Sequence, residues 1–117
     1  MLPKKHRLTT RYEFGKVKRD GVKVSSRFFY LYYLKRFDPV EDTKVGVVLS
    51  NKFSKVAPQR NRVKRQFREI IRTNFGKIKS GYWIVIYPKS NVKEAKYEEI
   101  NTDFLKILQK SPFSHEL

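Results

Sequence analysis

The segment from Gln59 to Arg72 (QRNRVKRQFREIIR) restricts the fold more than any other part of the chain. Four apolar residues recur in it at helical spacing and, at about 100° per residue, fall within roughly 80° of one another. These residues are Val63, Phe67, Ile70 and Ile71. Such a stripe needs another element to pack against. With Pro58 suited to a first helical turn and Gly76 beyond the last, the pattern predicts an amphipathic helix that ends near Phe75.

The outer positions of the same segment are dominated by arginine and lysine, and Glu69 is its only acid. Cations in the first turn oppose the helix macrodipole by about 0.3–1 kcal/mol each, so stability does not account for them. Arginine also has a planar fork that bridges phosphate oxygens in a bidentate way. A solvated outer face is the alternative, but the excess of arginine favours a helix that binds a polyanion.

Composition supports a polyanionic partner. The 117 residues carry 27 basic and 11 acidic side chains, a formal net charge of +16, and such self-repulsion is relieved by nucleic acid or an anionic membrane. No apolar run is long enough for a membrane span or a signal segment. Cysteine is absent, which excludes disulfides and fits a cytoplasmic protein. Only His6 and His115 offer imidazoles, so a histidine-based catalytic or metal site is not expected.

The other segments predict an α+β domain that spans residues 1–117. Thr10 and Glu13 form a capping-box pattern before a short helix that turns Phe14 and Val17 inward and ends near Gly21. The β-branched and aromatic residues from Val22 to Lys35 indicate strands. In this region Phe29, Leu31 and Tyr33 fall on one face, and Phe28, Tyr30, Tyr32 and Leu34 fall on the other.

Two more strands and a last helix complete the prediction. Residues 37–43 indicate a turn, Val45–Ser50 and Tyr82–Tyr87 indicate buried strands, and residues 51–57 indicate a loop. We expect Asn91 to cap the last helix. Its inner face holds Ile100, Phe104, Ile107 and Leu108. The predicted order is αβββαβα, with helices packed on one four-stranded sheet.

The run RNRVKRQFRE (Arg60–Glu69) resembles the RNR motif of the bacterial ribonuclease P protein subunit family. VGVVLSNK before it, YWIVIYPK after it and YEFGKVKRDG near the start extend the resemblance over nearly the whole chain. The resemblance implies a four-stranded sheet of the ribosomal-protein type with a left-handed βαβ crossover through the RNR helix. Periodicity does not predict that crossover, and base rates oppose it.

The resemblance also implies two RNA-binding surfaces and a catalyst that is RNA. The residues implied to face the catalytic ribonuclease P RNA are Lys52, Arg60, Asn61, Arg62, Arg65 and Arg68. The residues implied to line a cleft for the 5′ leader of precursor tRNA are Phe14, Lys18, Tyr32, Lys64 and Arg68. Phosphate contacts would position the helix, and unpaired bases would stack on the aromatic rings.

The implied chemistry is metal-assisted phosphodiester hydrolysis, with Mg²⁺ held by RNA and substrate phosphates. No catalytic side chain and no metal ligand are expected from the protein, and one protein is expected per RNA. Two positions depart from the family pattern. Lys18 stands where several members carry a second cleft aromatic, and Tyr87 stands where the residue is often small.

Two alternatives stay open from the sequence. A structural RNA-binding protein of the ribosomal type fits the size, the charge and the α+β pattern equally well. A protein-only nuclease would need a carboxylate pair or a histidine base, but the acids are scattered. Glu94, Glu98 and Glu99 fit a solvated face of the last helix. A membrane-surface role is weaker, because the basic helix uses its apolar stripe for the core.

Overall fold

The computed structural model describes residues 2–36, 42–49 and 56–114. In chain order the elements are η1 (Lys4–His6), α1 (Arg11–Asp20), β1 (Val22–Ser25), β2 (Phe29–Lys35), β3 (Lys44–Val47), α2 (Ala57–Asn74), η2 (Phe75–Lys77), β4 (Tyr82–Pro88), η3 (Ser90–Glu94) and α3 (Tyr97–Gln109). The predicted α+β class and αβββαβα order are confirmed. The predicted strand end at Ser50 and most of the predicted loops at 37–43 and 51–57 lie outside the described residues.

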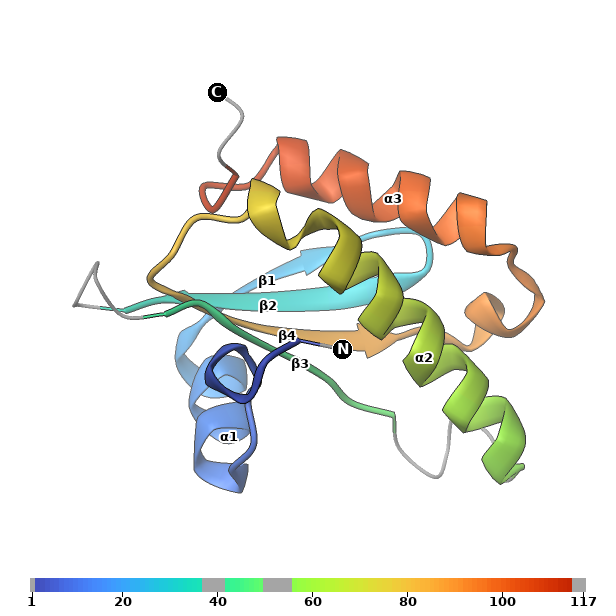
Figure 1. Ribbon diagram of the computed structural model, residues 1–117, viewed down its shortest axis with the longest axis horizontal. Helices are drawn as coiled ribbons and strands as arrows, with labels where there is room; N and C mark the ends of the chain where they lie inside the picture. The colour runs from blue at the N-terminus through green and yellow to red at the C-terminus, as the bar shows by residue number, and fades with distance from the viewer. Residues whose placement is uncertain (1, 37–41, 50–55, 115–117) are drawn as a thin grey trace.

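The four strands form one sheet in the order β1-β2-β4-β3. β2 pairs antiparallel with both β1 and β4, whereas β3 runs parallel to β4. Helices cover both faces of this sheet: α1 lies on one side, and α2 and α3 lie together on the other (Figure 1). The sheet is therefore the middle layer, and each of its faces meets a different set of helical side chains.

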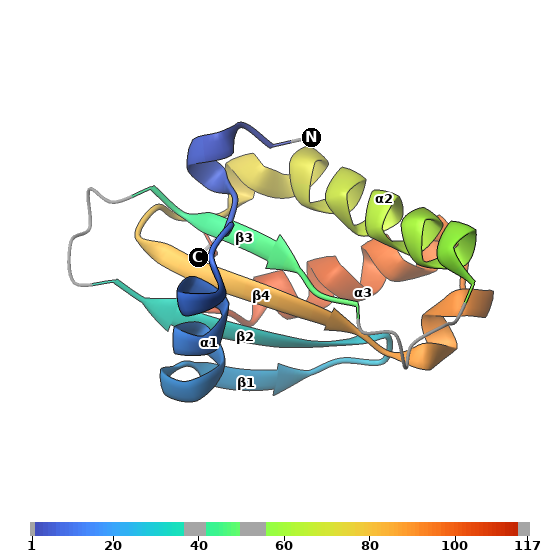
Figure 2. The same ribbon diagram turned by 90° about the horizontal axis from the view of Figure 1, so that it is seen from below.

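The connection from β3 through α2 to β4 is left-handed. Figure 2 looks at the sheet from the α1 side, so α2 lies behind it. In that view β3 and β4 both run from left to right, and β4 lies below β3. When the sheet is viewed instead from the α2 side, with both strands pointing up, β4 lies to the left of β3. This arrangement defines a left-handed connection. The crossover implied by the family resemblance is present, although almost all such connections are right-handed.

The larger core lies between the sheet and the α2–α3 layer. α2 contributes the predicted stripe, in which Val63, Phe67 and Ile70 are fully buried and Ile71 nearly so. From β2, the alternation turns Phe29 and Leu31 into this core, where the Phe29 ring meets the Phe67 ring edge-on at 5.8 Å. The stripe fixes α2 on the domain and leaves its other side available.

A smaller core lies between the sheet and α1. Val17 is fully buried there with Leu8, Trp83 and Val85, and Phe14 packs against them half-buried. Both inward residues predicted for α1 are confirmed. The burial of only these few side chains attaches α1 to one end of the sheet face.

The predicted face of Phe28 is wrong. It precedes β2 and packs in the larger core, 4% exposed, rather than beside Tyr30 and Tyr32. The chain bends here, because Ser26 N–H and Oγ–H both donate to the Phe29 carbonyl at 2.9 Å. The Phe28 N–H then donates to an Asp103 carboxylate oxygen on α3 at 3.0 Å. The alternation of faces therefore begins only at Phe29.

The start of α1 is held by the predicted capping box. Thr10 Oγ1 accepts from Glu13 N–H, and Glu13 Oε1 accepts from the N–H groups of Thr9 and Thr10, each at 3.0 Å. Lys44 Nζ of β3 lies 3.2 Å from the other carboxylate oxygen. Burial alone would raise the pKa of Glu13, but the bonds from Thr9, Thr10 and Lys44 outweigh it and lower the pKa to about 2. The same carboxylate thus starts α1 and fastens it to β3.

Gly21 ends α1 as predicted, but for a different reason. Its φ is −84°, so it does not adopt the left-handed conformation of a common helix cap. A Cβ at this position would instead lie 2.4 Å from the Val17 carbonyl oxygen and 2.7 Å from that of Tyr33. The glycine is needed for the close approach of α1 to β2.

Asn91 does not cap the last helix. It lies in η3, where its side-chain amide donates to the Arg27 carbonyl at 3.0 Å. α3 begins later, and Glu99 closes its first turn by accepting from Lys96 N–H at 2.9 Å. The inner face of α3 is otherwise as predicted, with Ile100, Phe104 and Leu108 buried and Ile107 half-buried. Within the described parts of the chain, no helix is both long enough and apolar enough to cross a membrane.

Candidate nucleic-acid interface

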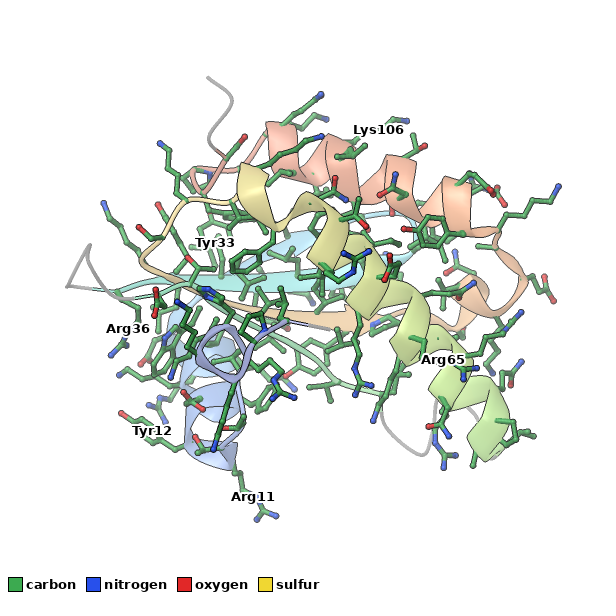
Figure 3. The ribbon with its side chains drawn as sticks, in the orientation of Figure 1. Arg11, Tyr12, Tyr33, Arg36, Arg65 and Lys106 are labelled. Carbon is green, nitrogen blue, oxygen red and sulfur yellow. The ribbon has the colours of Figure 1, made fainter. Side chains whose placement is uncertain are left out.

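The outer side of α2 carries arginines that the fold leaves without an acidic partner. Arg65 and Arg68 are exposed, and neither makes an ion pair with any residue that the structure describes. Figure 3 shows Arg65 on the middle of the helix. The only acid of α2, Glu69, pairs instead with Arg72, whose Nε lies 3.1 Å from its carboxylate. Two predicted arginines thus keep their full hydrogen-bonding capacity for a ligand.

The start of α2 carries cations with no acid in its own first turn. Val56 at the N-cap offers no side-chain cap, and the first turn holds no acid. Asn61 and Arg62 are exposed, and Arg60 is half-buried. The positive end of the helix dipole, combined with these cations, makes this end of α2 attractive to an anion.

Two other residues predicted for this surface are Arg62 and Lys52. Arg62 Nη2 donates to the Lys93 carbonyl of η3 at 2.9 Å, which ties α2 to η3. Lys52 lies outside the described residues, so its predicted role rests on the sequence.

On the α1 side of the sheet, the helix covers one end of the face and leaves the other end open. α1 lies over the end that holds Trp83, whereas Tyr30, Tyr32 and Tyr87 lie towards the other end, over which no described helix passes (Figure 2). We call this region the open half-face and define it by these three tyrosines. It is an aromatic surface within the same rigid domain as the arginines of α2.

A cavity of about 200 Å³ lies between the N-terminal segment, α1, β3 and α2. Phe14 from α1 and Arg68 from α2 both line it, together with Gly46 and Ile71. The Phe14 ring sits directly on Gly46, where a Cβ would lie only 2.4 Å from the ring. The structure therefore brings together two residues predicted for the leader cleft, one aromatic and one cationic.

Tyr32 and Lys18 meet through a residue that was not predicted as part of the site. The rings of Tyr32 and Tyr87 pack edge-on with centroids 5.4 Å apart, and Lys18 Nζ lies 5.3 Å from the centroid of Tyr87. Burial, with a smaller contribution from Tyr32, raises the pKa of Tyr87. The departure of Lys18 and Tyr87 from the family pattern was the only sequence signal of this contact.

The remaining residue predicted for the leader cleft is Lys64. It is half-buried on α2, one turn before Arg68, so the two side chains project from the same side of the helix. No described contact joins Lys64 to Phe14 or Tyr32. Four of the predicted leader residues thus fall into two groups, Phe14 and Arg68 at the cavity and Lys18 and Tyr32 on the open half-face, and Lys64 lies in neither.

Acidic side chains gather elsewhere on the molecule. The η3–α3 region carries Glu94, Glu98, Glu99 and Asp103, and α3 lies on the side of the sheet opposite α1 (Figure 1). In the described part of the chain, no three histidine, aspartate or glutamate side chains lie together as a group that could hold a metal ion. Along the chain, these four acids are interleaved with Lys93, Lys96 and Lys106.

Comparison with known proteins agrees with this arrangement. The family model "Ribonuclease P" matches residues 2–111. The chain is 36% identical to the ribonuclease P protein component of a Pseudanabaena species over 98% of each chain, and 31% identical to that of Syntrophomonas wolfei over 95% of this chain and 91% of the relative.

Solved structures give the same result for the fold. The RNase P protein from Thermotoga maritima superposes with a TM-score of 0.78 at 27% identity, covering 90% of this chain and 96% of that chain. The Staphylococcus aureus RNase P protein superposes with a TM-score of 0.81 at 20% identity, covering 94% and 98%. By its sequence, its fold and its arginine-bearing helix, the chain belongs to the ribonuclease P protein component family and is a subunit of an endoribonuclease of tRNA processing.

Proposed function

We propose that the protein binds ribonuclease P RNA through the outer side of α2 and holds the 5′ leader of precursor tRNA on its α1 side. The RNA would make the cut, and no protein side chain would take part in the bond-breaking step. Arg65 and Arg68 carry the proposal for α2, because both are exposed on a helix fixed by a buried stripe and neither pairs with an acid that the structure describes. A pre-ordered row of guanidinium groups binds phosphates with little loss of side-chain freedom.

The leader assignment draws on the aromatic residues. Phe14 and Arg68 line one cavity, and Tyr32 lies beside Lys18 and Tyr87 on the open half-face. Stacking of an unpaired base is worth about 1–3 kcal/mol and tolerates every base, which suits a protein that must accept many leaders. The neighbouring cations would neutralise the phosphates of the same strand.

Mg²⁺ would reach the reaction through the ribonucleoprotein. RNA and substrate phosphates would hold the ion, and the ion would stabilise the charge of the attacking and leaving oxygens. The protein would contribute by neutralising phosphates where the RNA folds closely, which reduces the Mg²⁺ concentration needed. We further propose one protein per RNA and a cytoplasmic location.

The test is cleavage of a precursor tRNA at low Mg²⁺ by a bacterial ribonuclease P RNA, with and without the protein. We expect strong stimulation by the protein and no cleavage by the protein alone. Cleavage by RNA-free protein would contradict catalysis by RNA. Failure to stimulate a cognate, correctly folded RNA would instead favour a structural RNA-binding protein of the ribosomal type.

A further inference from the structure

The outer side of α1 takes no part in the packing of the domain or in the surfaces proposed above. At about 100° per residue, Tyr12, Lys16 and Arg19 fall within roughly 60° of one another, on the side of the helix away from the buried Val17. Tyr12 is 66% exposed, more than any other large apolar side chain that the structure describes. Figure 3 shows its ring at the far end of α1, pointing away from the sheet.

Gly15 lies on the same outer side, and the fold does not require a glycine there. A Cβ at Gly15 would meet no atom within 4 Å, whereas one at Gly21 or Gly46 would collide with its neighbours. Among the described glycines only Gly81 has a positive φ, so the backbone of Gly15 suits any residue. Glycine destabilises a helix relative to alanine, because it loses more backbone freedom on folding. What the bare backbone does permit is the close approach of another molecule.

The charge of this side of α1 indicates an anionic partner. Arg11 makes no ion pair with any described residue. Lys16 and Arg19 share a single acid, Asp20, whose carboxylate oxygens lie 3.4 Å and 3.3 Å from their nitrogens. The other acid of α1, Glu13, is buried in the capping box. An excess of positive charge therefore remains beside the exposed ring and the bare backbone.

The shape of this surface fits double-stranded RNA better than an unpaired strand. A convex helix with one aromatic ring offers no platform for successive unpaired bases. An RNA duplex instead presents a wide, shallow minor groove lined by 2′-hydroxyl groups, which proteins recognise by its shape. Gly15 lets the helix lie close to that groove, and the Tyr12 hydroxyl can donate to or accept from a 2′-hydroxyl. The flanking cations can then reach the phosphates on either side.

We propose that the outer side of α1 docks in the minor groove of a duplex segment of ribonuclease P RNA. The residues of this surface are Arg11, Tyr12, Gly15, Lys16 and Arg19. The choice of RNA rests on the proposed function: an RNA already held by α2 is tethered to the domain, which favours a second contact with the same molecule. Because α1 and α2 lie on opposite faces of the sheet, the protein would be clamped between two parts of one folded RNA (Figure 1).

The test measures the affinity of protein variants for ribonuclease P RNA. Gly15→Gln covers the bare backbone without meeting any atom of the domain, and glutamine is a better helix former than glycine. We expect its affinity to fall by about fivefold or more, although its resistance to urea should increase. Gly76→Gln is the matched control, because a Cβ at this glycine of η2 also meets nothing within 4 Å.

The ring and the charge of the surface are tested separately. Tyr12→Ala should also weaken binding, and Arg19→Gln should lower the magnitude of the log–log salt slope by about one unit or less. Lys106→Gln, at an exposed cation of α3 on the other side of the sheet, controls for a general loss of charge (Figure 3). In hydroxyl-radical footprints of the complex, Gly15→Gln should remove protection from one duplex segment, and Arg65→Ala should remove it from a different part of the RNA.

Three outcomes would overturn the inference, and they differ in what else they affect. If Gly15→Gln and Tyr12→Ala bind ribonuclease P RNA as tightly as wild type, and Arg65→Ala binds it less tightly, α1 makes no such contact and the proposed function stands. If the two α1 variants lose affinity for mature tRNA alone, the surface binds the stem of the substrate instead. If wild type does not bind ribonuclease P RNA, the proposed function fails together with the inference.

Discussion

At the scale of single residues, the position of one acid decides which arginines of α2 are available. Glu69 lies three residues before Arg72 and pairs with it, so that arginine is partly neutralised. Arg65 and Arg68 have no described acidic partner, although all three arginines are exposed on the same helix. The exposure of these three side chains therefore does not by itself show that Arg72 is less available to phosphate than Arg65 and Arg68.

Arg65→Ala should weaken binding to ribonuclease P RNA and reduce its dependence on salt. Loss of one phosphate contact lowers the magnitude of the log–log slope by about one unit or less. Arg72→Ala is the control, because it removes a charge that Glu69 already compensates in part. Titrations of ribonuclease P RNA with each variant at several salt concentrations measure the affinity and its salt dependence. An unchanged slope for Arg65→Ala with a lower melting temperature would indicate a structural role instead.

Glu13→Gln should lower the free energy of unfolding at pH 7 by about 1–3 kcal/mol, because the native hydrogen bonds favour the charged carboxylate. The folded pKa, about 2, lies below the ordinary 4.5, so this stabilisation is complete above pH 4.5 and is lost as the pH falls towards 2. Urea unfolding between pH 2 and pH 7 should show the wild type and the variant converging at low pH. Glu94→Gln, at an exposed carboxylate of η3, should show no such convergence.

The carboxylates of Glu13 and Asp103 show which single contacts the sequence can predict and which it cannot. The capping box of Thr10 and Glu13 follows from local spacing, because both partners lie within one helical turn. The burial of Phe28 could not be predicted, since it depends on Asp103 in a helix that is distant in sequence. Tyr87 was missed for the same reason: its contacts with Tyr32 and Lys18 exist only after the sheet and α1 have assembled.

At the scale of elements, the open half-face exists because α1 is short and covers only one end of the sheet face. α1 is fastened by Val17, by the Glu13–Lys44 pair and by the seat of Phe14 on Gly46. Its ten residues end before the open half-face. The sequence predicted the helix and its inward residues, but the extent of its cover depends on the crossing of α1 over the strands, which no local pattern encodes.

Gly46→Ala tests whether the seat of Phe14 matters. The new methyl group would lie 2.4 Å from the ring, so Phe14 must move, at a cost of about 1–3 kcal/mol in the free energy of unfolding. Because Phe14 lines the cavity with Arg68, precursor tRNA should lose affinity relative to mature tRNA. The control is Gly15→Ala, whose methyl group meets nothing within 4 Å and should stabilise α1 by about 0.5–1 kcal/mol. Unchanged leader preference in Gly46→Ala would remove Phe14 from the leader site.

At the scale of the whole molecule, basic side chains lie on both sides of the sheet. The arginines of α2 lie on the helix that packs beside α3, and the open half-face with its lysines lies on the α1 side. The four acids of the η3–α3 region are interleaved along the chain with Lys93, Lys96 and Lys106, so they do not make that region a purely repulsive surface towards RNA. The α+β class and element order followed from periodicity, whereas the left-handed crossover did not, because hydrophobic spacing carries no information about handedness.

Tyr32→Ala should separate the two proposed RNA surfaces. Loss of the ring on the open half-face should weaken precursor tRNA with a 5′ leader, by the equivalent of about 1–3 kcal/mol at most, and leave mature tRNA nearly unchanged. Affinity for ribonuclease P RNA should also persist, because the arginines of α2 lie on a different element from Tyr32 of β2. Equal losses for precursor and mature tRNA would contradict the leader assignment. Competition binding with matched RNAs gives both values.

The helix α2 serves two partners with one periodicity. Its apolar stripe faces the domain, and its arginines face outward at positions fixed by the same 3.6-residue repeat. A substitution affects one of these roles at a time. A single inserted residue, however, would rotate every later side chain by about 100° and would turn arginines inward while it exposed the stripe. The family should therefore tolerate a single substitution in this helix more readily than any change in its length between Val63 and Ile71.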